Sequence, residues 1–505
     1  MHSFNLKLVA LAAWAAAVSA TEPSASRHQL RASWCDFSKL GSHLSKGAQI
    51  YLPGTSDFDN AVARWSNLKV PKSNAVVVPA TELDVVETIK FANEQKVPYL
   101  AANGVHGSIT TLGKMTHGIE ILLTGLNSVE IAADGQSAKI GGGIRSKNLT
   151  DALWAAGKQT VTGTCECVGY LGPALGGGHG WLQGHHGLVS DQFLSMNVAL
   201  ANGSLVTIDQ KSDLFWAMKG AGHNFGIVTS VTSKIFDIQN RNYAVSTIFF
   251  SGDKVKKVYQ TANEQWLTNG TAIPEDLNNW SYWFYDPTID ASGPVVVMYI
   301  IQEGVDAVSE THTKPFLDIG PIMVQNKTGD YRDLANWTGI SLADGPCQKT
   351  GNANPRFPIY LKSYNPDAQA EVYELFKQAT TNASTPFAGA LFMFEGYAVQ
   401  GVQALSDDAS AFAYRSDNLL VAPLLSYKPN GPALERRAAD LGNRMRDVLF
   451  RGSGESSLNT YVNYAYGNEN AKAWYGADEA RQQRLRALKK AYDPTGKFSF
   501  YAPIA

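Results

Sequence analysis

Four glycine-rich segments in the first half of the chain constrain its fold most strongly. They occupy residues 101–108, 141–143, 175–180 and 220–226, and they lie close to short apolar or β-branched runs. Glycine at a strand end lets the backbone come close to a ligand, and successive free N–H groups form anion-binding nests. Four such turns in one part of the chain predict a site for a large ligand that carries phosphate.

The common nucleotide motifs are missing from these segments. No G-x-G-x-x-G joins a first strand to a first helix with an acidic residue about 20 positions later. No G-K-[ST] of a P-loop is present either. The sequence therefore argues against a nicotinamide cofactor. The net charge of −2 and the lack of a basic stripe give no sign of a nucleic-acid partner.

Alternating periodicities predict an α+β protein with two domains and a returning tail. A first unit reads strand 75–80, helix 81–95, strand 97–103. Further expected elements are strands 118–124, 128–133 and 137–143, helix 146–159, a hairpin 194–208 that turns at Asn202-Gly203, a helix and strand within 213–236, strands 243–250 and 293–304, helix 253–269, a strand within 453–470 and a helix within 477–505. The chain divides into a cofactor-binding domain over 69–240, a substrate domain over 241–452 with a sizeable sheet, and a segment over 453–505 that returns to the first domain.

The N-terminal sequence predicts a secretory signal peptide over residues 1–20. Lys7 precedes the apolar run 8–18, and Val18-Ser19-Ala20 resembles a cleavage site. No later run is long enough to span a membrane. Seven N-x-[ST] sequons fit a secreted glycoprotein, namely Asn148, Asn202, Asn269, Asn279, Asn326, Asn336 and Asn382.

Such a compartment permits disulfides, and the chain has four cysteines, at positions 35, 165, 167 and 347. Cys35 with Cys347 is one possible pair. A bond between Cys165 and Cys167 is sterically poor at a separation of two residues. A zinc site built from these two and the histidines at 179, 185 and 186 matches no usual ligand spacing, so we expect no metal.

Two reactive side chains lie at the glycine turns. His106 stands within the first turn, and Cys165 precedes the run that contains the third. A neutral imidazole and a thiolate are the side chains best suited to bond an electrophilic flavin ring. From the residues alone, a hydrogen-bonding histidine and a packed cysteine remain open.

Residues 65 to 236 resemble the flavin domain of the berberine-bridge-enzyme-like family, within the vanillyl-alcohol-oxidase superfamily. The similarity rests on the loop Ala102-Asn103-Gly104-Val105-His106-Gly107-Ser108, on Cys165-Glu166-Cys167-Val168-Gly169, on Leu175-Gly176-Gly177-Gly178-His179-Gly180, on "DLFWAMKGAGHNFGIVTS" from 213, on Tyr461-Val462-Asn463 and on the tail "DPTGKFSFYAPI". It is dense in the first domain and thin from 240 to 450.

The resemblance implies a PCMH-type FAD-binding fold and a covalent flavin. His106 matches the residue that bonds the 8α-methyl of FAD, and Cys165 matches the residue that bonds flavin C6. The implied cofactor-binding set is Asn103, Gly104, Val105, His106, Gly107, Ser108, Cys165, Gly169, Gly176, Gly177, Gly178, His179, Gly226, Ile227, Val228, Tyr461 and Asn463. Cys167 is a second thiol near the matched position, and register favours Cys165.

Two positions depart from the family loop. Ala102 stands where a basic residue is common, and Val105 stands where glycine precedes the histidine. Both departures bear on how the diphosphate is held.

The implied reaction is a two-electron oxidation by FAD with reoxidation by O₂, while a base takes a proton from the substrate. Candidate bases are Glu395, Tyr397, Tyr461 and Tyr464, because a carboxyl in an apolar strand can have a raised pKa. The alternative for Glu395 is the solvent face of an edge strand. The expected substrate is a bulky natural-product intermediate. The alternative hypotheses are that the protein is a carbohydrate oxidase, or that it is a non-redox cyclase or binding flavoprotein.

Overall fold

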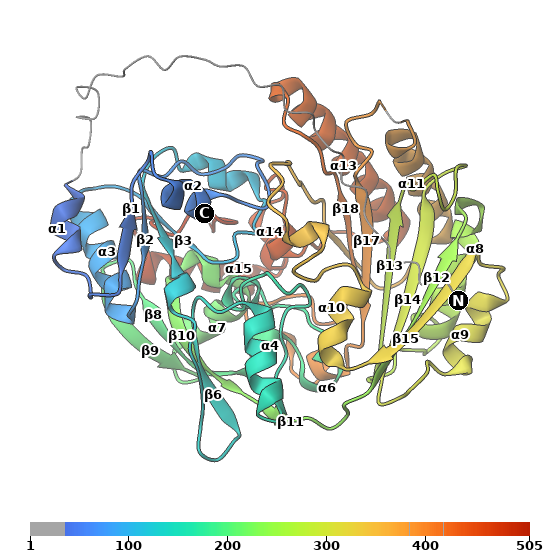
Figure 1. Cartoon of the computed structure of the whole chain (residues 1–505), viewed down its shortest axis with the longest axis horizontal. Coiled ribbons are helices and arrows are strands. Elements are labelled where there is room, and N and C mark those ends of the chain that lie inside the picture. Colours follow the sequence, from blue (N-terminus) through green and yellow to red (C-terminus); the bar gives the residue numbers. More distant parts are fainter. Residues whose placement is uncertain (1–35, 383, 418, 505) are drawn as a thin grey trace.

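The computed structural model describes residues 36–382, 384–417 and 419–504, so the signal over 1–20 and Cys35 lie outside it. The described chain forms two lobes side by side (Figure 1). The first lobe contains two smaller sheets, and the second lobe contains one large sheet. The expected α+β class is confirmed.

The first lobe holds a mixed four-stranded sheet and an antiparallel five-stranded sheet. The four-stranded sheet has the order β1 (Gln49–Tyr51), β2 (Ala75–Val78), β4 (Ile119–Leu122), β3 (Tyr99–Ala102), and β4 runs parallel to both β2 and β3. The five-stranded sheet has the order β5 (Val129–Ile131), β6 (Ser137–Gly141), β10 (Ile227–Lys234), β8 (Phe193–Ala199), β9 (Leu205–Asp209). A short antiparallel pair, β7 (Lys158–Gln159) with β11 (Phe236–Asp237), also belongs to this lobe.

The second lobe is built on a seven-stranded antiparallel sheet. Its order is β15 (Met323–Gly329), β12 (Tyr243–Phe250), β14 (Val295–Glu303), β13 (Leu277–Phe284), β17 (Leu391–Tyr397), β18 (Leu419–Leu424), β16 (Ile359–Leu361). Strand β17 is internal and pairs with β13 and β18. The alternative that placed Glu395 on the solvent face of an edge strand is therefore wrong.

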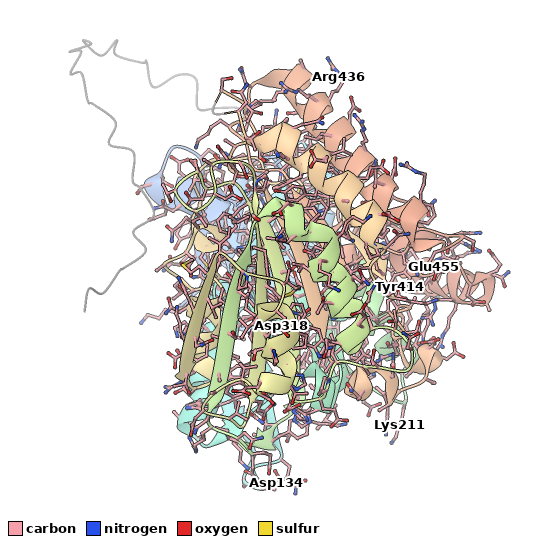
Figure 2. All side chains as sticks on the ribbon, turned by 90° about the vertical axis from the view of Figure 1, so that its right-hand side faces the viewer. Asp134, Lys211, Asp318, Tyr414, Arg436 and Glu455 are labelled. Atoms are coloured by element: carbon pink, nitrogen blue, oxygen red, sulfur yellow. A yellow bond between two sulfur atoms is a disulfide. The ribbon has the colours of Figure 1, made fainter. Side chains whose placement is uncertain are left out.

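Helices cover the outer face of this large sheet, and the other face packs against the first lobe. The α-helices of the described residues are α1 (Phe37–Gly41), α2 (Ser56–Val62), α3 (Glu82–Glu94), α4 (Ser146–Ala155), α5 (Leu171–Ala174), α6 (Gln183–His186), α7 (Asp213–Ala221), α8 (Val255–Trp266), α9 (Glu310–Leu317), α10 (Leu334–Trp337), α11 (Pro366–Thr380), α12 (Gln400–Gln403), α13 (Gly431–Ser453), α14 (Ala471–Tyr475) and α15 (Glu479–Tyr492). Figure 2 looks onto the outer face, where helices lie in front of the strands and Asp318 follows α9.

Strand alternation explains which residues face the first lobe. In β17, Phe392 and Phe394 belong to the cluster beneath the outer helices, whereas Met393 and Tyr397 belong to the cluster shared with the first lobe. Since side chains alternate with a period of two, Glu395 points with Met393 and Tyr397 toward the first lobe. The sheet thus presents a polar residue to the glycine loops.

The tail returns to the first lobe, but one expected element differs. Segment 453–470 contains a 3₁₀ turn at Val462–Tyr464 and no strand. The expected helix in 477–505 is α15, and its Lys489 Nζ donates to Asn224 O at 2.8 Å in the first lobe. Within the described ranges, we find no helix with the length and apolar character needed to cross a membrane.

Candidate functional site

The loop after β3 carries His106 and leaves its backbone donors unused. In the described part of the chain, no acceptor receives a hydrogen bond from the N–H groups of residues 105–109. The Oδ1 atom of Asn103 is also buried without a partner. Buried backbone donors are normally paired, so a run of free ones fits phosphate oxygens. The loop therefore fits the diphosphate of FAD.

Val105 gives this loop an unusual backbone. Its φ is +54°, in the left-handed region that β-branched residues avoid. Such a conformation costs roughly 1–3 kcal/mol and persists where the surrounding structure holds it. The family pattern has glycine at this position, so the departure seen in the sequence is a strained residue beside His106.

His106 is a neutral imidazole between two carbonyls. Its Nδ1 lies 3.1 Å from Gly104 O, and its Nε2 lies 2.8 Å from Pro346 O. Burial lowers the pKa of His106 to about 4. A neutral ring carries one N–H, so only one of these contacts is a hydrogen bond. The other nitrogen keeps a free lone pair, as a nucleophile needs.

Three cysteines meet beside this histidine. Cys167 and Cys347 form a disulfide, and Cys165 is free. The Cys165 Sγ lies 3.7 Å from each of the two bonded sulfurs. The possible pairing of Cys347 with Cys35 is therefore wrong, because Cys347 already has a partner. Cys167, the neighbour that could have been the flavin anchor, carries no free thiol.

The two proposed anchors converge because their loops pack tightly. A Cβ added to Gly104 would lie 2.6 Å from Gly169 N and 2.9 Å from Cys167 O. The nucleophilic atoms of His106 and Cys165 lie within 4.8 Å of each other. Burial raises the pKa of Cys165 to about 11, so the side chain is a thiol rather than the expected thiolate at neutral pH. Cys167 could complete a metal-like triad with these two, but its sulfur is committed to the disulfide.

A segment of the second lobe covers these loops. Residues 340–348 run between α10 and β16 and carry both Pro346 and Cys347. Leu342 N donates to the Glu166 carboxylate at 2.7 Å, and Glu166 N donates to Ile340 O at 3.3 Å. The disulfide thus joins the first lobe to a strap from the second.

The glycine run 176–178 approaches the tail and a loop of the second lobe. A Cβ on Gly176 would meet Asn463, and one on Gly177, whose φ is +101°, would meet Phe412. His179 follows, with Nε2 at 2.7 Å from Tyr360 Oη and Nδ1 at 2.8 Å from Gln183 Oε1. These glycines therefore allow close packing between the lobes and the tail.

Ile227 and Val228 begin β10, and Gly226 directly precedes it. Val228 is linked to Asn103 through Gly142. Gly142 N donates to Thr229 O at 2.8 Å, and a Cβ on Gly142 would lie 2.5 Å from Val228 O. The Asn103 amide donates to Gly142 O at 3.3 Å. Gly226 and Ile227 face Val198 and Ala199 of β8 instead, so they support the strand that holds this corner.

Glu395 is a buried carboxyl held by two tyrosines. It is 2% exposed. Tyr397 Oη donates to Oε2 at 2.7 Å, and Tyr464 Oη donates to Oε1 at 2.8 Å. Burial raises the pKa of Glu395 above its usual value, while both hydrogen bonds and the charge of Arg356 act in the opposite direction. Three of the four candidate bases thus form one hydrogen-bonded group.

Tyr461 stands beside this group rather than within it. Its ring centroid lies 5.2 Å from that of Tyr464 and 4.9 Å from that of His179. Asn463, in the same 3₁₀ turn, donates to Pro173 O at 2.8 Å. The segment with the predicted tyrosines therefore links the glycine run to Glu395.

Two residues that the sequence did not single out connect His106 to Glu395. The Trp65 ring stacks on His106 with centroids 5.4 Å apart. The Arg356 guanidinium lies 4.5 Å from the Trp65 centroid and 4.2 Å from the Tyr464 centroid. Neither residue stands in a glycine turn or a recognised motif, so no signal in the sequence marks it.

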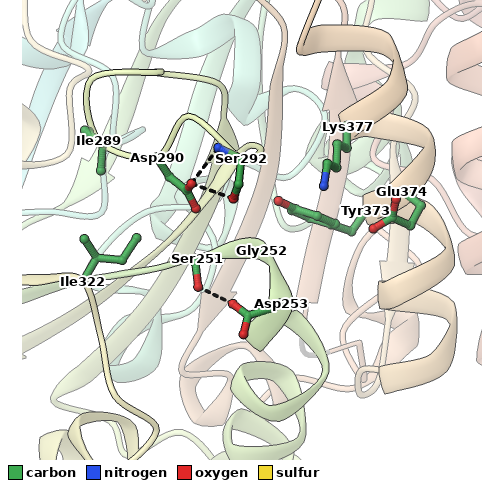
Figure 3. Close-up of a pocket in the computed structure, with 10 residues that line it drawn as sticks. All are labelled: Ser251, Gly252, Asp253, Ile289, Asp290, Ser292, Ile322, Tyr373, Glu374 and Lys377. Carbon is green, nitrogen blue, oxygen red and sulfur yellow. Dashed lines mark hydrogen bonds between the residues drawn. The ribbon is translucent and has the colours of Figure 1, made fainter.

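A surface pocket lies elsewhere, between the sheet edge and α11 (Figure 3). Its ten lining residues include Ser251, Asp290, Tyr373 and Lys377. None of them belongs to the candidate site. The pocket therefore adds nothing to the functional argument.

The sequons differ in exposure. Six of the seven asparagines are exposed, namely Asn148, Asn202, Asn269, Asn326, Asn336 and Asn382. Asn279 is 2% exposed in β13, and its amide donates to Tyr299 O at 3.0 Å. The burial of Asn279 leaves no room for a glycan in the folded chain, so the structure argues against this one of the seven predicted sites.

Comparison with known proteins agrees with this arrangement. Residues 73–209 match the family model described as FAD binding domain. The chain is 54% identical over 498 residues to the FAD-linked oxidoreductase chyH of Penicillium rubens, covering 99% of each chain. It is 36% identical to the FAD-linked oxidoreductase anuG of Penicillium roqueforti, covering 92% of this chain and 91% of that protein.

Solved structures share the fold across both lobes. BBE-like 1 of Physcomitrella patens matches with a TM-score of 0.78 at 22% identity, covering 93% of this chain and 100% of that one. The xylooligosaccharide oxidase of Myceliophthora thermophila, solved with xylobiose, matches with a TM-score of 0.76 at 22% identity, covering 92% and 98%. GilR, solved with pregilvocarcin, gives 0.73 at 17% identity, covering 89% and 98%.

Proposed function

Since this chain belongs to the berberine-bridge-enzyme-like FAD-linked oxidoreductases, we propose that it is an oxidase of a bulky small molecule, a natural-product intermediate. The proposed reaction passes hydride to covalently held FAD and then electrons to O₂. The observation that carries the proposal is Glu395, a buried carboxyl that two tyrosines hold and that the sheet turns toward the His106 and Cys165 loops.

In this reaction Glu395 is the base. FAD, when bound, supplies the hydride acceptor. Glu395 takes the proton from the substrate O–H or N–H as the adjacent C–H is lost. Its raised pKa brings it closer to neutral pH, which favours proton transfer. Tyr397 and Tyr464 keep both oxygens aligned and stabilise the carboxylate before the transfer.

The tethers are His106 and Cys165 in this proposal. His106 offers a neutral ring with a free lone pair, and Cys165 is the one cysteine of the local three that has a free sulfur. Since burial keeps Cys165 protonated, its thiol must lose a proton before the sulfur can bond to the flavin.

An aromatic wall supports a bulky, flat substrate. Trp181 and Trp280 pack with centroids 4.2 Å apart, and Trp280 meets Tyr397 edge-on at 5.7 Å. Tyr397 itself bonds Glu395, so the wall ends at the proposed base. Such rings give apolar contact with preferred stacked or edge-to-face geometry.

Release of hydrogen peroxide tests the substrate class. The purified holoenzyme is offered aromatic natural-product intermediates and oligosaccharides in parallel. Peroxide with aromatic substrates supports the proposal, and turnover of sugars alone overturns it. A bound flavin that no substrate bleaches would instead indicate a non-redox protein.

The base is tested by Glu395→Gln. This change keeps the shape but removes the proton acceptor, so the rate of flavin reduction should fall roughly 10²- to 10⁴-fold. Flavin absorbance per chain should stay at the wild-type value. An unchanged reduction rate contradicts the assignment of Glu395.

Acid precipitation tests the tethers. Flavin colour should stay on the washed pellet of the wild type. His106→Ala should leave a thioether-linked flavin, and Cys165→Ala a histidyl one. A colourless wild-type pellet rejects both bonds, whereas loss of the thioether in Cys167→Ala alone would move the second bond to Cys167.

The proposed compartment is the secretory pathway. The disulfide is typical of oxidising compartments, and six sequons are exposed. Protein from the growth medium should begin after about residue 20. Mapping of glycan sites should find none at Asn279; a glycan there would show that the chain is modified before β13 folds.

A further inference from the structure

Arg356 is held in a slot between two aromatic rings. Its guanidinium lies 4.5 Å from the Trp65 centroid and 4.2 Å from the Tyr464 centroid. Asn354 fixes the segment, because its side-chain amide donates to Trp65 O at 2.7 Å and its backbone N–H donates to Ser66 Oγ at 2.9 Å. An isolated bridge pairs Arg356 with Leu424. The cation is therefore positioned, not a loose surface side chain.

This guanidinium has no acidic partner. Among the described residues, none accepts a hydrogen bond or forms an ion pair with it, and its Nε is buried without an acceptor. Three buried arginines elsewhere each have a carboxylate: Arg64 with Glu120, Arg415 with Asp191, and Arg446 with Glu469. A partly buried cation without an anion is unusual, because burial of charge is favourable only when the charge is paired.

The slot lies at the proposed reaction centre. Trp65 stacks on His106, and Tyr464 donates to Glu395, so Arg356 stands between a proposed tether and the proposed base. The charge of Arg356 acts on the titration of His106, Cys165 and Glu395. Glu395 is the one carboxyl in this group, and both of its oxygens already accept hydrogen bonds from tyrosines.

We propose that Arg356 binds a carboxylate of the substrate, so the substrate class is an aromatic acid. This inference rests on the proposed function. A guanidinium offers a planar fork of donors that matches a carboxylate with two parallel hydrogen bonds. Both rings lie close to the guanidinium carbon, and neither supplies an acceptor for its N–H donors, so these donors remain available to a ligand. An acid held there keeps its aromatic part near Tyr464 and Glu395.

Binding of benzoate and benzamide to the holoenzyme tests the proposal. The two probes share size and shape and differ in charge. Titration is followed by the shift of the flavin absorbance band at neutral pH. Wild type should bind benzoate roughly tenfold to 100-fold more tightly than benzamide, as one charge-assisted pair provides. Arg356→Met should abolish that preference and leave the affinity for benzamide unchanged.

The matched control is Arg484→Met. Arg484 lies 4.0 Å from the Trp216 centroid on exposed α15, so the change removes a similar stacked arginine away from the site. This variant should keep the full preference for benzoate. Equal binding of the two probes by wild type, or a preference that survives in Arg356→Met, overturns the proposal.

Further measurements distinguish a failure of the Arg356 proposal from a failure of the proposed function. A fall in bound FAD in Arg356→Met would show that the arginine holds the cofactor and would overturn the substrate assignment. The wild-type comparison of benzoate with benzamide needs no variant, so it decides the matter if Arg356→Met does not fold. Peroxide release by wild type without a preference for benzoate rejects Arg356 alone, whereas a chain that binds no FAD rejects the proposed function.

Discussion

At the scale of single residues, the protonation of Glu395 sets the expected pH dependence. Burial raises its pKa, and the hydrogen bonds from Tyr397 and Tyr464 lower it. A base must be ionised, so the rate of flavin reduction should fall as pH drops through this raised pKa. The acid limb of the wild type should therefore lie above the usual carboxyl value of about 4.3.

Tyr464→Phe should move that acid limb to higher pH. The change removes one hydrogen bond that favours the carboxylate, so the pKa of Glu395 rises further. The measurement is the pH profile of flavin reduction, in wild type and variant. Tyr492→Phe is the control, since its hydroxyl bonds Asp213 on the exposed side of the first lobe. An acid limb that stays in place would show that Tyr464 does not act on Glu395.

Site residues that stand in local motifs could be predicted from the sequence. Residues whose role depends on contacts with distant parts of the chain could not. His106 stands in a glycine-rich turn, Cys165 precedes the run that contains another, and the structure brings their nucleophilic atoms within 4.8 Å. Glu395 is marked by its apolar strand. Arg356 is marked by nothing local, because its role depends on Trp65 and Tyr464, which are distant in the chain.

At the scale of elements, the strap 340–348 is tied to the flavin loop by the Cys167–Cys347 bond, which spans 180 residues. Cys347→Ser should lower the free energy of unfolding by roughly 2–5 kcal/mol, since a cross-link restricts the unfolded chain. Denaturant unfolding measures it. Cys165→Ser keeps the disulfide and serves as the control. Equal midpoints for Cys347→Ser and wild type would contradict the prediction.

Periodicity predicted most elements correctly, but the strand that it predicted within 453–470 does not form. The apolar runs in 243–250 and 293–304 correspond to β12 and β14 of the large sheet, in which every residue is buried. Segment 453–470 has a similar tyrosine-rich pattern, yet it forms a 3₁₀ turn. Its aromatic side chains contact His179 and Glu395 across the lobes. Its backbone hydrogen bonds go to three separate neighbours, Tyr360, Ala473 and Thr110, and so they form no ladder.

At the scale of the whole molecule, Lys489 joins the tail to the first lobe. Its Nζ donates to Asn224 O and Phe498 O, each at 2.8 Å, and to Asp493 at 2.7 Å. Lys489→Met should cost about 3 kcal/mol of stability, because it leaves a buried carboxylate unpaired. Thermal unfolding is the measurement, and Lys490→Met, on the exposed side of α15, is the control. Matching unfolding of both variants would refute this role.

Where the three cysteines meet, the disulfide acts as a protecting group for two of the three sulfurs. The Cys167–Cys347 bond masks two sulfurs and leaves Cys165 as the single nucleophilic thiol among them. A chain folded under reducing conditions would offer three thiols to the same electrophile. If the flavin is tethered as proposed, oxidative folding before its attachment would decide which sulfur it meets.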